Sequence, residues 1–203
     1  MWSVVNLLER VTAFMLLVIL IPFVLCVAML IVVLSRRSPF VAHRRVGRDA
    51  CELWVLKFRT MWGDATSTRA KHLLIERLPS GSELQSKSTD DPRVASRFAA
   101  FCRKYSIDEL PQLWHVIRGD MALIGPRPLT AQEIAAFYGS DAGRLLLVRP
   151  GLSGLWQVNG RSKLSLEQRH RLDLFMLENW SLKLYVEILQ ATFPCVLSGR
   201  NAW

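Results

Sequence analysis

The chain has 203 residues, which suits one domain with an appendage. Its hydrophobic share of 51% is high for a soluble domain that also carries 21% charged residues. The net charge of +9 indicates an anionic partner, which would be nucleic acid, anionic lipid headgroups or a phosphorylated substrate. The cysteines form no Cys-x-x-Cys pair and the histidines no His-x-x-x-His pair. This excludes the usual zinc motifs and indicates reduced thiols in a domain that faces the cytoplasm.

The hydrophobic excess is concentrated in residues 11–34, a stretch without charge. As a straight helix it would be roughly 36 Å long, enough to cross a hydrocarbon core of about 30 Å. Pro22 stands in its middle, so a kink is expected. A modest kink leaves a spanning helix, whereas a sharp one gives two short arms that enter and leave by the same face. Flanking positive charge does not decide between them, and physical arguments alone slightly favour spanning.

The rest of the chain predicts one domain of helices, a strand region and loops. In chain order the expected elements are a basic interfacial junction (35–47), a strand or hairpin arm (53–61), a polar excursion (62–92) with one short helix (70–78), three helices (94–105, 106–118 and 129–138), a glycine-rich loop (149–160) and two helices (165–180 and 182–197). The last two carry Trp, Phe and Leu on one face, so they would be either core helices or amphipathic helices in the membrane interface.

Residues 103–128 carry the strongest chemical signal, the adjacent carboxylates Asp108 and Glu109. A structural interpretation is available, because Ser106-x-x-Glu109 matches a capping box, and taken alone it is favoured. Pro111 complicates it, since at the fifth helical position a proline loses a backbone hydrogen bond. Neighbouring helical residues point about 100° apart, so the pair also suits two roles. One carboxylate would attack, and the other would hold a metal or handle a proton.

Basic residues flank this segment and the glycine-rich loop, namely Arg103, Lys104, Arg118, Arg127, Arg149 and Arg161. Any one of them alone is more often a solvated surface charge. Pro126 and Pro128 hold Arg127 between them, fix the local backbone and so aim the guanidinium group. Together with the paired acids, these cations predict a site for Mg²⁺ and a diphosphate.

Five motifs extend the pattern, KFRTM (57–61), DPR (91–93), SIDELPQLWHVIRGDMALIGPRP (106–128), RPGLSGLWQVNGR (149–161) and ENWSL (178–182). With these motifs in this order, nearly the whole chain resembles the bacterial sugar transferases, the monotopic phosphoglycosyl transferases. The motifs are long and highly specific.

The resemblance implies transfer of a sugar phosphate from a UDP-sugar to undecaprenyl phosphate, with release of UMP. By motif, Asp108 would be the nucleophile that carries the covalent sugar phosphate, and also a Mg²⁺ ligand, with Glu109 as its essential partner. Arg127, with Pro126 and Pro128, would bind the nucleotide end. Four further residues would be basic groups for the substrate, namely Arg103, Lys57, Arg149 and Arg161.

The resemblance also implies an α+β, helix-rich fold in the family's minimal form. Residues 1–36 would form a re-entrant membrane helix broken at Pro22, and residues 37–203 a catalytic domain with interfacial helices on the cytoplasmic side of the bacterial inner membrane. His115 departs from a common asparagine, and Tyr185 from an aspartate that many members carry. Residues 94–100 also lack the usual glycine. These departures bear on substrate choice and local packing.

Two other functions compete with the transferase. A non-catalytic anchor that docks anionic lipids would require Asp108 and Glu109 to be only a helix cap. A membrane-tethered nucleic-acid binder is not expected, because the aromatic residues stand mostly at apolar helical spacing rather than between basic residues. The sequence does not name the sugar, although an unmodified hexose for exopolysaccharide synthesis is the preferred guess. It also leaves the oligomeric state open, a homodimer included.

Overall fold

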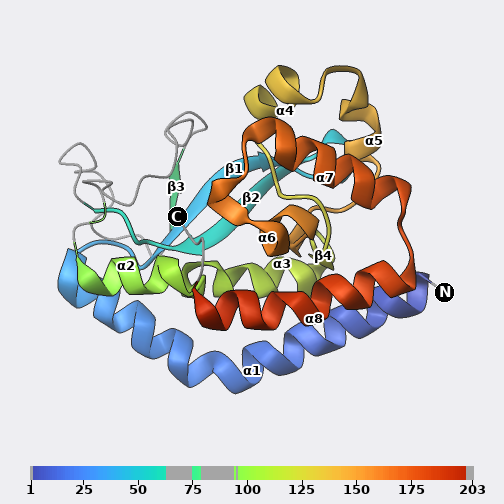
Figure 1. The fold of residues 1–203 in the computed structure, drawn as a ribbon. Helices are drawn as coiled ribbons and strands as arrows, with labels where there is room; N and C mark the ends of the chain where they lie inside the picture. Colours follow the sequence, from blue (N-terminus) through green and yellow to red (C-terminus); the bar gives the residue numbers. More distant parts are fainter. Residues whose placement is uncertain (1, 63–74, 79–93, 95, 200–203) are drawn as a thin grey trace.

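The N-terminal apolar segment forms α1 (Trp2–Ser35), one continuous helix with Pro22 inside it. The computed structural model of the chain describes residues 2–62, 75–78, 94 and 96–199. Figure 1 shows α1 as two arms that meet at an open bend, with the rest of the molecule on the inner side of the bend. A proline explains such a bend, because it removes a backbone hydrogen bond and its ring clashes with the preceding turn. The expected break at Pro22 is therefore a bend within an uninterrupted helix.

Much of the surface of α1 has no protein cover. Large apolar side chains near the middle of the helix are exposed, among them Val18, Ile19, Ile21, Phe23 and Leu25. Within the described residues α1 is the one helix long and apolar enough to cross a membrane, and only 17% of its most apolar window is buried. An uncovered apolar surface of this extent indicates contact with lipid.

The opposite side of α1 belongs to the hydrophobic core. Ala13 is fully buried in a cluster with residues of β2 (Glu52–Phe58) and α3 (Leu113–Arg118), and Leu20 packs against the same cluster. Trp2 and Val5 pack against a second cluster that includes Ile188 of α8 (Leu182–Ser198). The apolar helix α1 therefore packs directly on the rest of the chain through both of these clusters.

A three-stranded sheet follows α1, with strand order β2-β1-β3. The strands β1 (Phe40–Val46) and β2 (Glu52–Phe58) are antiparallel, and β3 (Ile75–Leu78) is parallel to β1. The sequence prediction for β2 is confirmed. Most of the segment 35–47, expected to be an interfacial junction, is strand β1, whose backbone is satisfied by two partner strands. The expected helix at 70–78 is wrong over β3, where pairing with β1 overrides local preference, and its remainder lies outside the described residues, as does the DPR motif.

The segment before and after the acid pair is helical, as expected, but divided. α2 (Arg97–Lys104) begins at Ser96, whose side chain accepts a hydrogen bond from the Ala99 nitrogen. The predicted helix at 106–118 consists of a 3₁₀ helix, η2 (Ile107–Gln112), followed by α3 (Leu113–Arg118). Pro111 lies inside η2 and accounts for the division. Gly119 ends α3 in the left-handed conformation with φ 85°.

A second sheet forms where a loop was expected. β4 (Ala122–Ile124) and β5 (Gly151–Ser153) are parallel, and α6 (Leu155–Asn159) follows β5. Gly125 and Gly151 lie at the closest backbone approach, because a Cβ added to Gly151 would lie 2.1 Å from the Gly125 nitrogen. The glycines of residues 149–160 thus serve close backbone packing as well as turns.

Gly151→Ala is expected to lower the free energy of unfolding by about 3 kcal/mol or more, because the new methyl group meets backbone that cannot move aside. Gly143→Ala is the matched control. Gly143 lies in a helix, and a Cβ there would meet nothing within 4 Å. It should stabilise the protein by about 0.5–1 kcal/mol. Thermal unfolding of both variants in the same detergent measures the difference, and equal midpoints would contradict the close approach.

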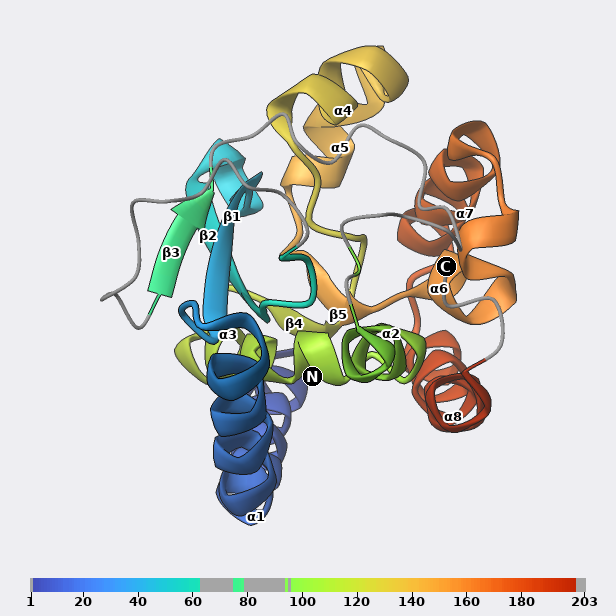
Figure 2. The same ribbon diagram turned by 90° about the vertical axis from the view of Figure 1, so that its left-hand side faces the viewer.

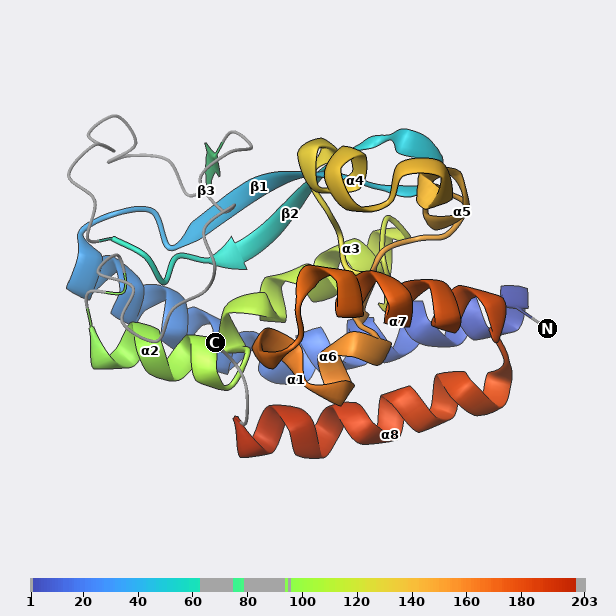
Figure 3. The same ribbon diagram turned by 45° about the horizontal axis from the view of Figure 1, so that its top comes forward.

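The remaining elements complete the helix-rich part of the fold. Their bounds are η1 (Arg48–Ala50), α4 (Ala131–Phe137), η3 (Gly139–Asp141), α5 (Ala142–Leu146), η4 (Arg161–Lys163), α7 (Leu166–Glu178) and α8 (Leu182–Ser198). α4, α7 and α8 confirm three predicted helices, and capping boxes at Thr130 and Ser165 begin α4 and α7. Figure 2 shows the three-stranded sheet on one side of β4 and β5, and α6 to α8 on the other. Figure 3 also shows β1 and β2 on the side of the molecule away from α6 and α8.

Candidate active site

The acid pair lies in η2, and its cap differs from the predicted one. Ser106 adopts a left-handed backbone with φ 56° and makes no side-chain cap hydrogen bond. Its Oγ instead accepts a hydrogen bond from Nη2 of Arg161 at 3.3 Å. The predicted capping box is therefore wrong. The left-handed serine turns its side chain away from the helix start, and the Glu109 side chain is bound elsewhere.

Glu109 forms an ion pair with Lys57 of β2. The Lys57 Nζ donates to Oε1 of Glu109 at 3.2 Å, and the two side chains are 12% and 21% exposed. Charge-assisted hydrogen bonds of this kind are strong and directional when partly shielded from water. The pair fixes the Glu109 carboxylate on the side of η2 that faces the sheet.

Asp108 points in another direction, because consecutive residues of a 3₁₀ helix are about 120° apart. Its side chain is partly buried. Cys102 of α2 has its pKa raised to about 12, first by burial and then by the negative charge of Asp108. The negative charge of Asp108 therefore affects the Cys102 thiol of α2, whereas Glu109 is held by Lys57 of β2. The two acids have different surroundings, as the prediction of two roles requires.

An open cavity lies beside Glu109. Its lining residues are His43, Arg45, Val55, Lys57, Glu109, Gln112, Arg127, Pro128, Gly151, Leu152 and Gln157. The structure thus brings together four predicted site residues, Lys57, Glu109, Arg127 and Pro128. Asp108 is not part of this lining and adjoins it through its neighbour Glu109.

The sheet contributes cavity residues that sequence reasoning missed. His43 and Arg45 alternate along β1 with residues of the opposite face, and Val55 and Lys57 do the same along β2, so all four share one face. Arg45 is only 6% exposed, which is unusual for an arginine. The signal was the alternation within FVAHRRV, which was interpreted as an interfacial junction instead of a strand.

Arg127 lies over the ring of Trp156, with 5.8 Å from its Cζ to the ring centroid. Within the described part of the chain its guanidinium forms no hydrogen bond or ion pair. Arg169 lies over the same ring at 4.8 Å, and its pKa is lowered by burial and by the charge of Arg127. Nearby, burial raises the pKa of Asp173 to about 7, although the Tyr138 hydrogen bond and the charge of Arg127 oppose the rise. Two guanidinium groups on one indole attract an anion.

The other predicted site residues lie around this centre. Arg161 contacts Ser106 at the start of η2, and Arg103 lies in the last turn of α2. The Pro126 carbonyl accepts a hydrogen bond from the Gly151 nitrogen at 2.8 Å, so this proline joins β4 to β5. Arg149 is elsewhere, in a buried network with Asn6 and Glu9 of α1.

His115 accounts for one departure from the family pattern. Its Nε2 accepts a hydrogen bond from the Leu56 nitrogen of β2 at 3.1 Å, and its Nδ1 lies 3.5 Å from Oδ2 of Asp120. Burial lowers the pKa of His115, which keeps Nε2 available as an acceptor. This bond holds β2 against α3 one residue before Lys57.

His115→Leu is expected to lower the free energy of unfolding by about 1–3 kcal/mol, because it leaves the Leu56 N–H unpaired. His115→Gln, which keeps an acceptor, should lose less. Because the folded-state pKa lies below 6.5, the unfolded chain takes up this proton first. The wild type therefore loses stability as the pH falls below about 6.5, and the glutamine variant lacks that component. Urea unfolding between pH 5 and 8 tests both expectations, and identical pH dependence would contradict them.

The acidic side chains near the cavity show how the expected magnesium ion could be held. The described residues contain no group of three or more His, Cys, Asp or Glu side chains that could hold a metal. Magnesium is commonly held by one or two carboxylates together with the phosphates of a substrate. Asp108 fits such a site, in which the ion enters with the diphosphate, while Glu109 is paired with Lys57.

An apolar helix that packs on the core, an acid pair and a cavity lined by basic residues beside Glu109 form a candidate site that suits an anionic ligand. The model of the bacterial sugar transferase family matches residues 2–199, and the chain belongs to this family.

Curated relatives agree with this assignment. An Erwinia amylovora protein named UDP-galactose-lipid carrier transferase is 39% identical over 82% of this chain, which spans 35% of that protein. The exopolysaccharide production protein ExoY of Sinorhizobium fredii is 37% identical over 94% of this chain and 84% of its own length. A Xanthomonas campestris UDP-glucose:undecaprenyl-phosphate glucose-1-phosphate transferase is 31% identical over 96% of this chain, which spans 39% of it. The chain therefore spans about a third of the longer relatives and most of the shorter one.

Proposed function

We propose that this protein transfers a sugar phosphate from a UDP-hexose to undecaprenyl phosphate and releases UMP, as a first membrane step of exopolysaccharide synthesis. The observation that carries the proposal is the cavity in which Lys57, Glu109 and Arg127 meet beside Asp108. The names of relatives support the donor and the acceptor, since they include a UDP-glucose:undecaprenyl-phosphate glucose-1-phosphate transferase and an undecaprenyl-phosphate galactose phosphotransferase.

In the first step a carboxylate oxygen of Asp108 attacks the β-phosphorus of the UDP-sugar. An oxygen–phosphorus bond forms, the bond from this phosphorus to the oxygen it shares with the α-phosphate breaks, and UMP leaves with that oxygen and the electron pair. In the second step an oxygen of undecaprenyl phosphate attacks the same phosphorus and displaces the carboxylate. The product is a sugar linked to undecaprenyl through a diphosphate.

The residues around Asp108 would act by charge and position. Arg127 lies beside an indole ring and has no ion-pair partner among the described residues, so it suits the nucleotide end of the donor. Lys57 holds Glu109 in place, and Arg161 holds the start of η2 through Ser106. Magnesium would supply neutralisation of the diphosphate charge when it binds with the substrate.

We propose further that α1 is re-entrant, with both ends on the cytoplasmic side of the inner membrane. The first arm contacts the catalytic part of the chain, since the Trp2 ring lies 5.7 Å from that of Trp180 and Glu9 accepts a hydrogen bond from Tyr185. A spanning helix would place Trp2 across the bilayer from these partners. Single cysteines near each terminus, labelled with a membrane-impermeant thiol reagent from the periplasm, test this arrangement. Labelling at either end would contradict it.

The assay for the reaction is UMP release from a panel of UDP-sugars with Mg²⁺ and undecaprenyl phosphate in detergent. We expect release with at least one UDP-hexose and transfer of the sugar to the lipid. Absence of turnover with every UDP-hexose would contradict the proposal and favour a membrane anchor. The same panel identifies the sugar.

A further inference from the structure

Glu9 is an acidic residue within the apolar helix α1, and it is almost fully buried, with 3% exposure. A buried carboxylate is costly unless charges and hydrogen bonds satisfy it, and more so next to lipid. Packing alone would be satisfied by an apolar residue at this position, so the carboxylate of Glu9 needs another explanation.

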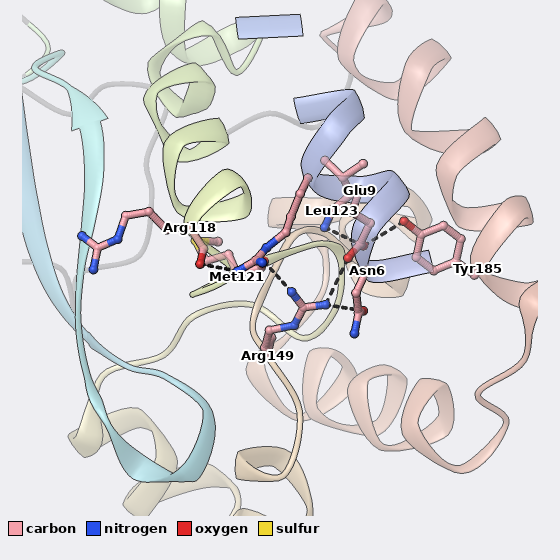
Figure 4. A network of polar contacts seen from close by, with 8 residues as sticks. Asn6, Glu9, Arg118, Met121, Leu123, Arg149 and Tyr185 are labelled. Carbon is pink, nitrogen blue, oxygen red and sulfur yellow. Dashed lines mark hydrogen bonds and ion pairs between the residues drawn. The ribbon is translucent and has the colours of Figure 1, made fainter. Parts of the chain in front are cut away.

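Three groups from different parts of the chain satisfy this carboxylate (Figure 4). Its Oε1 accepts hydrogen bonds from the Leu123 nitrogen at 2.9 Å and the Tyr185 hydroxyl at 2.8 Å. Its Oε2 accepts one from Nη2 of Arg149 at 3.1 Å. The same arginine also donates to Oδ1 of Asn6 and lies 3.4 Å from the Met121 carbonyl.

These contacts reach the beginnings of both strands of the small sheet. In β4 the Ala122 nitrogen donates to Pro150, whereas the Leu123 nitrogen points away from β5 and is satisfied by Glu9. Arg149 stands two residues before β5. Glu9 therefore ties α1 to the two strands that lead into the cavity.

β4 leads to residues of the candidate site, and β5 contributes residues to it. β4 continues into Gly125, Pro126, Arg127 and Pro128, and β5 contains Gly151 and Leu152 of the cavity wall. The Gly151 nitrogen donates a hydrogen bond to the Pro126 carbonyl. This bond ties the segment that carries Arg127 to both strands, so we treat the three as one unit. A displacement of the strand beginnings relative to α1 is passed on to Arg127.

We propose that Glu9 and Arg149 are positioning residues, which fix the segment of Arg127 relative to the membrane helix and thereby set the affinity for the nucleotide sugar. This inference rests on the proposed function. It gives Arg149 a role that acts through the backbone rather than by contact with the substrate. It also explains Tyr185, because a tyrosine hydroxyl can donate to the Glu9 carboxylate whereas an aspartate could not without a proton.

Glu9→Gln is the decisive variant, because the amide keeps an acceptor for Leu123 and Tyr185 but removes the charge that pairs with Arg149. We expect the KM for the UDP-sugar to rise about tenfold, the KM for undecaprenyl phosphate to stay unchanged, and amide exchange across 121–128 to become faster. Glu187→Gln is the matched control, since Glu187 lies on α8 in a loose pair 3.9 Å from Lys183. It should change none of these quantities.

A double-mutant cycle that combines Glu9→Gln with Arg127→Ala separates a positioning role of Glu9 from general destabilisation of the protein. If Glu9 acts through Arg127, Glu9→Gln adds little to the donor KM once Arg127 is absent. An undiminished effect in that background, or an equal rise in both KM values, would overturn the proposal. Amide exchange does not depend on turnover, so it decides the matter even if the wild type accepts no UDP-sugar. Faster amide exchange at 121–128 in Glu9→Gln then supports the proposal that Glu9 fixes this segment relative to α1, and unchanged exchange refutes it.

Discussion

Asp108→Asn is expected to reduce UMP release at least about a thousandfold while the protein remains folded. The amide has nearly the same shape as the carboxylate but cannot attack phosphorus. Asp49→Asn is the matched control, because Asp49 is exposed and has a left-handed backbone with φ 55°, which asparagine tolerates. The control should keep wild-type turnover and the same melting temperature as Asp108→Asn.

A covalent adduct gives a second test of the same role. Wild-type protein incubated with UDP-sugar and no lipid acceptor should gain the mass of the sugar phosphate, and peptide mapping should place it on Asp108. Asp108→Asn should gain nothing. Turnover near the wild-type rate in that variant, or an adduct on Glu109, would reverse the assigned roles. The ion pair between Glu109 and Lys57 argues against the second outcome, because it engages the Glu109 carboxylate.

The parts of the fold that sequence predicts well are those with local causes. α7 and α8 follow from helical spacing and from serine caps within the same segment, so neighbours along the chain determine them. The end of α3 follows from Gly119. β4 and β5 have distant causes. The partners β4 and β5 are separated by a stretch that contains two α-helices and a 3₁₀ helix, and each strand has only three residues. So short a strand carries no periodic signal of its own.

The candidate site divides in the same way. The motifs nominate Lys57, Glu109 and Arg127, and folding brings these together because strand β2 packs on η2 and β4 leads to the cavity. The capping-box expectation failed because Ser106 is held by Arg161, more than fifty positions along the chain. Glu9 was missed entirely. A single acid in an apolar run gives no indication of partners that lie far away in the sequence.

Arg127 and Arg149 make the second large prediction, because their motifs suggest the same role and the structure gives them different surroundings. Arg127→Ala is expected to lower kcat/KM for the donor about a hundredfold with little change in melting temperature. Its guanidinium lies over Trp156 and forms no hydrogen bond or ion pair with the described residues, so its removal leaves no protein group unpaired. Arg127→Lys should recover part of the loss, since a lysine keeps the charge without the fork.

Arg149→Ala should instead lower the free energy of unfolding by about 3–5 kcal/mol, because Glu9 then keeps a buried charge without its partner. Replacing both, as Glu9→Leu with Arg149→Met, should restore much of that stability but not the donor KM, since an apolar pair cannot bond the Leu123 nitrogen. Melting temperatures measure the stability, and donor kinetics the KM, of the wild type, of Arg149→Ala and of the double variant. If Arg149→Ala kept its stability and lost only donor affinity, Arg149 would be a substrate ligand and the buried network would have to open during turnover. The two arginines would then act at one site, and the distinction drawn from Glu9 would be wrong.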